Sequence, residues 1–115
     1  MDKIAQTARV FKALSDPTRL RIFQFLRTRC CPVAVDDSGA VSPAVGPTVG
    51  QVCCHVTGVE KADSRISFHL KELRNAGLIT VHKRGKFLLC GVDPSGLALL
   101  VEFGNADPVS VEAQC

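Results

Sequence analysis

The chain has 115 residues, of which 46% are hydrophobic and 22% charged, and its formal net charge is +3. This length supports a single domain, residues 1–115, with one modest core, and it excludes a second domain. With no Trp or Tyr and six Phe, the core must depend on aliphatic side chains and Phe. A mildly basic balance does not by itself indicate a nucleic-acid partner, because the position of the positive charge matters more.

The N-terminal residues and the apolar segments predict a protein of the cytoplasm. No apolar run approaches the length of a membrane span, and the first 14 residues lack the charged, apolar and small-residue order of a signal peptide. We therefore expect no membrane partner. In a reducing cytoplasm, six cysteines argue against disulfides and favour metal binding, redox sensing or packing.

The first part of the chain predicts two helices and a loop. Residues 2–14 carry apolar side chains at helical spacing. Asp16 suits an N-cap and Pro17 the first position of a second helix, because proline needs no hydrogen-bond acceptor there. The second helix extends over 18–28, with four side chains expected to face inward: Leu20, Ile22, Phe23 and Leu26. Residues 30–47 show no sustained period, which predicts a long loop with room for a short extended piece.

The second part of the chain predicts a helix-turn-helix over residues 48–76. Thr48 and Gln51 have the spacing of a capping box, so a third helix starts at Thr48. Asp63 or Ser64 caps a fourth helix that extends to residue 76. Gly77 is well placed to end that helix in the left-handed conformation. Three apolar side chains of the fourth helix are expected to face inward: Ile66, Leu70 and Leu73.

Two β-prone segments, 78–83 and 86–92, flank Arg84 and Gly85, and Gly permits the backbone angles of a tight hairpin. A last helix starts at Pro94. The expected fold is therefore mostly α with a small β-hairpin. A helix-turn-helix followed by such a hairpin is a winged helix-turn-helix, with the wing at 78–93.

The side chains of the fourth helix and of the hairpin predict double-stranded DNA as a partner. In a helix-turn-helix the second helix enters the major groove with its N-terminal residues against base edges. Arg65 can pair with guanine, and serines can bind bases or phosphates. Lysine and arginine can hold phosphate, and the hairpin suits backbone or minor-groove contact. The predicted DNA-binding residues are Ser64, Arg65, Ser67, Phe68, His69, Lys71, Lys83, Arg84 and Lys86. The alternative is that these are only solvated charges. DNA binding is favoured because basic residues at the hairpin tip and polar residues at the start of the fourth helix occur together.

Two vicinal cysteine pairs are candidate metal ligands: Cys30 with Cys31, and Cys53 with Cys54. A loop that folds back would bring the four thiols together. Thiolates favour soft ions, so three sulfurs suit arsenite or antimonite, and four suit Zn, Cd or Pb. Neighbours on a helix diverge by about 100°, so Cys53 and Cys54 cannot easily bind one ion unless the helix distorts. Cys90 is expected in the core of the wing.

Several readings of the thiols stay open. Metal or metalloid sensing is favoured, and thiol oxidation or persulfide sensing is the alternative. A single Cys53 could also be a small buried hydrophobe. No organic cofactor is expected. An enzyme is not expected either, because no Cys-x-x-Cys, nucleophile elbow or paired carboxylates support one.

Two segments resemble one known family. Residues 11–22, FKALSDPTRLRI, resemble the entry to the winged-helix core of ArsR/SmtB-type repressors. Residues 64–79, SRISFHLKELRNAGLI, resemble their recognition helix and its exit into the wing. The resemblance implies a homodimer formed by the first and last helices, which binds a twofold-symmetric operator and is released by an inducer.

The chain departs from this family in four places. Residues 32–47 are longer than the usual connection, and Glu60-Lys61 looks like a small insertion. Family members that sense arsenite commonly carry Cys-x-Cys-x-x-Cys in the third helix, and only Cys53 has a match. The acidic and histidine ligands of the zinc and nickel sensors are absent from 95–103, apart from Glu102. As a hypothesis, inducer binding pulls Cys30 and Cys31 toward the third helix and tilts the helix-turn-helix.

Overall fold

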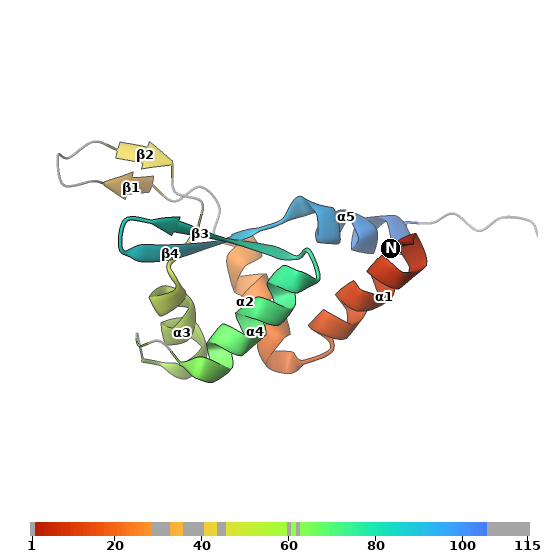
Figure 1. Cartoon of the computed structure of the whole chain (residues 1–115), viewed down its shortest axis with the longest axis horizontal. Coiled ribbons are helices and arrows are strands. Elements are labelled where there is room, and N and C mark those ends of the chain that lie inside the picture. The colour runs from red at the N-terminus through yellow and green to blue at the C-terminus, as the bar shows by residue number, and fades with distance from the viewer. Residues whose placement is uncertain are drawn as a thin grey trace, which may run out of the picture.

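The computed structural model describes residues 2–28, 46–59, 61 and 63–105, together with the backbone of 33–35 and 41–43. These residues form five helices and two antiparallel hairpins (Figure 1). The helices are α1 (Lys3–Leu14), α2 (Pro17–Thr28), α3 (Val49–Thr57), α4 (Ser64–Asn75) and α5 (Pro94–Gly104). The strands are β1 (Val33–Val35), β2 (Val41–Pro43), β3 (Ile79–Arg84) and β4 (Phe87–Val92). The expected fold class, mostly α with a small β-hairpin, is confirmed.

Local side-chain caps explain where α3 and α4 begin. The Thr48 hydroxyl accepts a hydrogen bond from the Gln51 amide at 3.1 Å, and the Gln51 side chain accepts one from the Thr48 amide at 2.9 Å. This reciprocal pair is the predicted capping box. Asp63 caps α4 by accepting from the Arg65 amide at 2.7 Å. Ser64 is therefore the first helical residue, and the alternative with Ser64 as the cap does not hold.

The end of α4 and the start of α5 meet through two glycines. Gly77 has a φ of +77°, as predicted for the residue that ends a helix. Its carbonyl oxygen accepts a hydrogen bond from the Gly96 amide at 2.8 Å. A Cβ atom at Gly96 would lie 2.5 Å from that oxygen, so the approach of α5 leaves no space for a side chain there.

The wing is the hairpin of β3 and β4, whose register pairs Ile79 with Val92 and Arg84 with Phe87. The other edge of β4 is also paired, because the Cys90 amide donates to the Pro47 carbonyl at 2.8 Å. This contact fixes the chain just before α3 against the wing. The helix-turn-helix and the wing are therefore joined through the backbone as well as through the core.

The prediction of a long loop over residues 30–47 is partly wrong. Its described residues include β1 and β2, which pair antiparallel with Val33 opposite Pro43 and Val35 opposite Val41. Valine is favoured in strands, and the sequence between these strands, Asp-Asp-Ser-Gly-Ala, has the composition of a turn. The short extended piece is thus a hairpin of its own (Figure 1).

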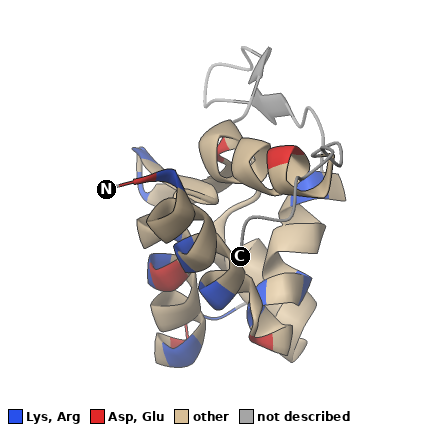
Figure 2. Ribbon diagram, turned by 90° about the vertical axis from the view of Figure 1, so that its right-hand side faces the viewer, with Lys and Arg blue, Asp and Glu red and all other residues tan. Residues whose placement is uncertain are grey.

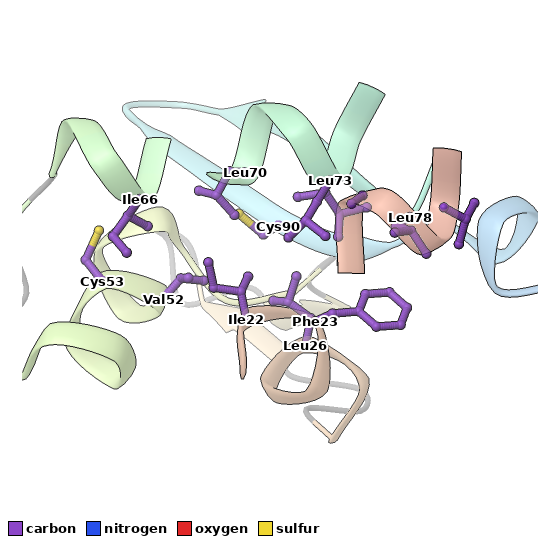
Figure 3. Packing of buried hydrophobic residues seen from close by; sticks show 13 residues of the cluster. Ile22, Phe23, Leu26, Val52, Cys53, Ile66, Leu70, Leu73, Leu78 and Cys90 are labelled. Carbon is purple, nitrogen blue, oxygen red and sulfur yellow. The ribbon is translucent and has the colours of Figure 1, made fainter. Parts of the chain in front are cut away.

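The core lies where α2, α3, α4 and the wing meet (Figure 3). The apolar stripe of α4 points into it as predicted. In α2, Leu20 was expected to face inward, but it is 49% exposed. Each helical residue advances by about 100°, so Leu20 lies about 110° from the middle of the stripe that α2 buries. The side chains buried here are Val10, Ala13, Ile22, Phe23, Leu26, Val52, Cys53, Ile66, Leu70, Leu73, Leu78, Ile79, Leu89 and Cys90.

Candidate nucleic-acid interface

The second helix of the helix-turn-helix, α4, turns one face outward. Ile66, Leu70 and Leu73 hold the opposite face in the core (Figure 3), and α2 packs against both α3 and α4. Most of the α4 residues predicted to bind DNA are exposed: Ser64, Arg65, Ser67, Phe68 and Lys71. Phe68 is 55% exposed, which is unusual for a large apolar side chain and suits contact with a thymine methyl group.

Asp63 holds Arg65 across the start of α4. The Asp63 Oδ2 atom lies 3.3 Å from the Arg65 Nη2 atom, and the Arg65 side chain remains 82% exposed. The hydrogen bonds from Arg65 hold the pKa of Asp63 below its usual range, and the same carboxylate raises the pKa of Arg65. An exposed ion pair contributes little to stability, so Arg65 can exchange this partner for a base.

His69 lies at the edge of the outward face, in contact with α2. Its Nδ1 atom is 3.2 Å from Arg19 Nη1. Because a guanidinium can only donate, Nδ1 must accept, and the neutral ring then carries its proton on Nε2. His69 is half-buried, so it can reach DNA only through Nε2. Arg19 was not among the predicted site residues, since no spacing within the sequence relates it to a residue 50 positions away.

The turn of the wing carries the remaining predicted residues. Lys83, Arg84 and Lys86 are exposed around Gly85, whose φ is +61°. The Lys86 Nζ atom lies 5.5 Å from the centroid of the Phe87 ring. This basic tip is at one end of the molecule, opposite the end formed by α1 and α5 (Figure 1).

A groove of about 540 Å³ separates α4 from the wing. Ser67, Lys71 and Arg74 line it from α4, and Val81 and Leu88 line it from the wing. Of the predicted DNA-binding residues, Ser67 and Lys71 therefore line this groove, whereas its wing side is apolar.

The structure places the predicted thiol ligands in different surroundings. Cys53 is fully buried in the core, whereas the adjacent Cys54 is exposed. The two side chains diverge, as expected for neighbours on a helix. Cys30 and Cys31 lie outside the described residues. Within the part of the chain that the structure describes, no group of three or more Cys, His, Asp or Glu is arranged to hold a metal ion.

Cys90 is fully buried in β4, which confirms its predicted place in the wing core. Burial, and to a smaller extent the nearby Cys53, raises the pKa of the Cys90 thiol to about 11. His55 stacks on Phe25 with ring centroids 4.2 Å apart. His55, the exposed neighbour of Cys54 in α3, is therefore engaged with α2.

The surface formed by α1 and α5 is apolar. Phe11 and Phe103 meet edge to face, with centroids 5.2 Å apart, and they are 44% and 66% exposed. Ile4, at 81% exposure, lies in the same groove of about 400 Å³. The Lys3 and Glu102 side chains form an ion pair at its edge. We call this surface the α1–α5 face, and its exposed apolar side chains line one groove.

A helix-turn-helix with a polar, outward recognition helix beside a basic β-hairpin defines a winged helix-turn-helix regulator of transcription. The chain is 31% identical over 85 residues to an HTH-type transcriptional regulator of Methanocaldococcus jannaschii, covering 74% of this chain and 75% of that protein. It is also 31% identical over 97 residues to a CadC homolog of Staphylococcus aureus, a cadmium resistance transcriptional regulatory protein. That alignment covers 83% of this chain and 64% of the homolog.

Among solved structures, a possible transcriptional regulator for arsenical resistance superposes with a TM-score of 0.60 at 31% identity. The match covers 84% of this chain and 80% of that one. No protein-family model matches the sequence. The chain belongs to the ArsR family of winged-helix transcriptional regulators, and its relatives are regulators rather than enzymes. None of the described helices has the length and apolar character needed to cross a membrane.

Proposed function

We propose that the protein is a homodimeric repressor that binds a twofold-symmetric operator and leaves it when a soft metal or metalloid binds its thiols. The observation that carries the DNA-binding part is the groove between α4 and the wing. Ser67 and Lys71 line its α4 side, and Ser64 and Arg65 are exposed at the start of the same helix. The basic residues Lys83, Arg84 and Lys86 are exposed at the tip of the wing. The N-terminal residues of α4 would read bases, and the wing would bind the backbone or the minor groove.

The α1–α5 face supports the dimer. A twofold axis through this face would cover Ile4, Phe11 and Phe103, whose exposure is costly in water. The wing tips would then lie at the two outer ends, because α1 and α5 are opposite the wing (Figure 1). Two recognition helices in such a pair can enter successive major grooves about 34 Å apart.

The inducer is proposed from the thiols and from two relatives. One relative is named for arsenical resistance and the other for cadmium resistance. Arsenite or antimonite is our first choice, with Zn, Cd or Pb as alternatives, and the proposed ligands are Cys30, Cys31, Cys53 and Cys54. Because Cys53 is buried and Cys54 exposed, an ion that takes both must distort α3. A distorted α3 would move α4 with it, which supplies a mechanism for release.

The test starts with duplexes that the wild-type protein selects from a random 30-base-pair library. Binding is followed by fluorescence anisotropy while arsenite, antimonite, Cd, Zn, Pb, polysulfide or peroxide is added in turn. We expect release by one of the thiophilic ions, with a 5- to 150-fold loss of affinity, which corresponds to a coupling of about 1–3 kcal/mol. Release by polysulfide or peroxide alone would replace the proposed inducer with thiol oxidation or persulfide sensing.

Cysteine variants locate the site. Replacing Cys30 and Cys31 with Ser should abolish the response while DNA binding survives. Cys54→Ser, at an exposed position, tests the α3 ligand without opening a cavity in the core. A protein that lacks Cys30, Cys31 and Cys54 and still responds normally would refute the proposed ligand set. Failure of the wild-type protein to bind any duplex at low salt would refute the proposal as a whole.

A further inference from the structure

A second charged hollow lies on the side of α4 away from the wing. It is a pocket of about 280 Å³ between the second half of α1, the start of α2 and the second half of α4. Three cations and one acid line it, and alanines form part of its wall. The lining residues are Arg9, Lys12, Ala13, Arg19, Glu72, Asn75 and Ala76. The pocket thus carries an excess of positive charge beside the recognition helix.

The cations of this pocket have little competition for an anion. Arg9 and Lys12 are exposed, and among the described residues no carboxylate lies within 4.0 Å of their charged nitrogens. Arg19 is fixed, because its Nε donates to the Ala13 carbonyl at 2.6 Å and its Nη1 donates to His69. It therefore supplies a fixed positive charge in the lining of the pocket. Glu72 is the opposing charge.

The geometry of α4 places this pocket where a DNA strand would pass. Ser67, Lys71 and Arg74 line the groove on the wing side, whereas Glu72 and Ala76 line the pocket on the other side. Asn75 borders both hollows. An α-helix with side chains is about 10–12 Å across, and the major groove is about 12 Å wide. A helix that lies in the groove therefore brings each of its flanks against one phosphate backbone.

We infer that Arg9 and Lys12 bind phosphates of the DNA strand that passes on the α1 side of the recognition helix. This inference rests on the proposed DNA binding, and it extends the interface to the first helix. The wing and Lys71 hold one backbone, and Arg9, Lys12 and the fixed charge of Arg19 face the other. Figure 2, which views the molecule from the end formed by α1 and α5, shows the Lys and Arg positions of α1 in blue.

The salt dependence of binding tests this inference. Each phosphate contact adds about 0.9 to the slope of log K against log salt on duplex DNA. Because each substitution is present in both protomers of the dimer, we expect Arg9→Ala and Lys12→Ala each to lower the slope by about 1.8, and the double variant by about 3.6. Each single variant should weaken binding about 60-fold at 0.1 M salt. The loss should be equal on a selected duplex and on a scrambled one, since phosphates carry no sequence information.

Three controls make the result decisive. Arg27→Ala removes an exposed charge at the other end of α2 and should leave the slope unchanged. Arg9→Lys, which keeps the positive charge, should have the slope of the wild-type protein. Glu72→Gln should strengthen binding on both duplexes, because it removes the opposing charge. Sedimentation equilibrium and circular dichroism verify that the variants remain dimeric and folded.

The outcomes separate this inference from the proposed function. If the wild-type protein binds duplex DNA and the Arg9 and Lys12 variants keep its slope, the inference is overturned and the proposed function stands. An Arg27 variant with an equal loss would also overturn it, because net charge would then explain the change. If the wild-type protein binds no duplex, the proposed function fails first.

Discussion

The guanidinium of Arg19 joins three elements by binding His69 at 3.2 Å and the Ala13 carbonyl at 2.6 Å. Ala13 belongs to the last turn of α1, Arg19 to the first turn of α2 and His69 to the middle of the recognition helix. The α1 helix also contributes to the apolar face through which we propose that the dimer forms. Arg19 therefore links α1 directly to the recognition helix.

Replacing Arg19 with Ala should destabilise the fold. Both hydrogen bonds are partly buried and involve a charged donor, so we expect a loss of about 1–3 kcal/mol in the free energy of unfolding. Arg19→Lys should recover only part of it, because an ammonium lacks the planar fork. Urea denaturation measures the effect. Arg21→Ala is the matched control, since Arg21 is exposed on the same helix, and a loss as large as that of Arg19→Ala would contradict the assignment.

Asp16 gives stability a defined dependence on pH. The hydrogen bond from the Arg19 amide is the largest influence that holds the pKa of Asp16 below its ordinary value of 3.8, with further help from the Thr18 amide and from the charge of Arg19. The folded state therefore binds this proton less readily than the unfolded state. The contribution is present above about pH 4 and is lost as the pH falls through the folded pKa.

Asp16→Asn isolates that contribution, because Asn still accepts the capping hydrogen bonds but does not titrate. The urea midpoint of the variant should lie below that of the wild-type protein at pH 6, and the difference should shrink toward pH 3. Comparison with the wild-type protein cancels the similar titration of Asp63. A difference that stays constant from pH 6 to pH 3 would show that the Asp16 charge plays no part.

Structural features that depend only on residues a few positions apart could be predicted from the sequence. Thr48 and Gln51 are three positions apart, so their capping box was visible as a spacing. The inward stripe of α4 follows from one helical period, and Gly77 follows from the need to end a helix. These local signals placed α4 and the wing, and with them the candidate DNA-binding surface.

Features that depend on distant partners could not be found in this way. Arg19 and His69 are 50 residues apart, and the charges of Arg9 and Lys12 become part of the interface only because α1 packs beside α4. Leu20 has the composition of a core residue, yet it lies off the buried stripe. The hairpin of β1 and β2 lacks the sustained alternation that distinguishes strands from loop, since each strand has three residues.

Gly96→Ala should disturb the junction of α4 and α5. The new Cβ would lie 2.5 Å from the Gly77 carbonyl oxygen, so the backbone of one helix end must shift. Overpacking of this kind costs about 1–3 kcal/mol. Gly104→Ala is the control, because a Cβ there meets nothing within 4 Å. Thermal unfolding of the two variants should separate them, and equal stability would show that the junction is not tightly packed.

Phe103→Ala should weaken the dimer. Phe103 is 66% exposed in the single chain, and burying a Phe side chain contributes about 1.5–3 kcal/mol. Because both protomers lose the side chain, we expect the dimer dissociation constant, measured by sedimentation equilibrium, to rise about 150-fold or more. Phe87→Ala, at a 52% exposed position on the wing, should leave it unchanged. If only the Phe87 variant dissociates, the dimer forms through the wing and the α1–α5 face has another role.

The described cysteines should differ in their reactivity. Cys54 is exposed, whereas Cys53 and Cys90 are buried, and a thiol with a pKa of about 11 is roughly 0.1% thiolate at pH 8. Brief treatment of the folded protein with iodoacetamide at pH 8, followed by peptide mapping, should therefore label Cys54 well before Cys90. Labelling in 6 M urea at the same pH should remove most of the difference, because burial is its cause. Rapid labelling of Cys90 in the folded protein would mean that the wing opens, and Cys90 would then join the thiols available to an inducer.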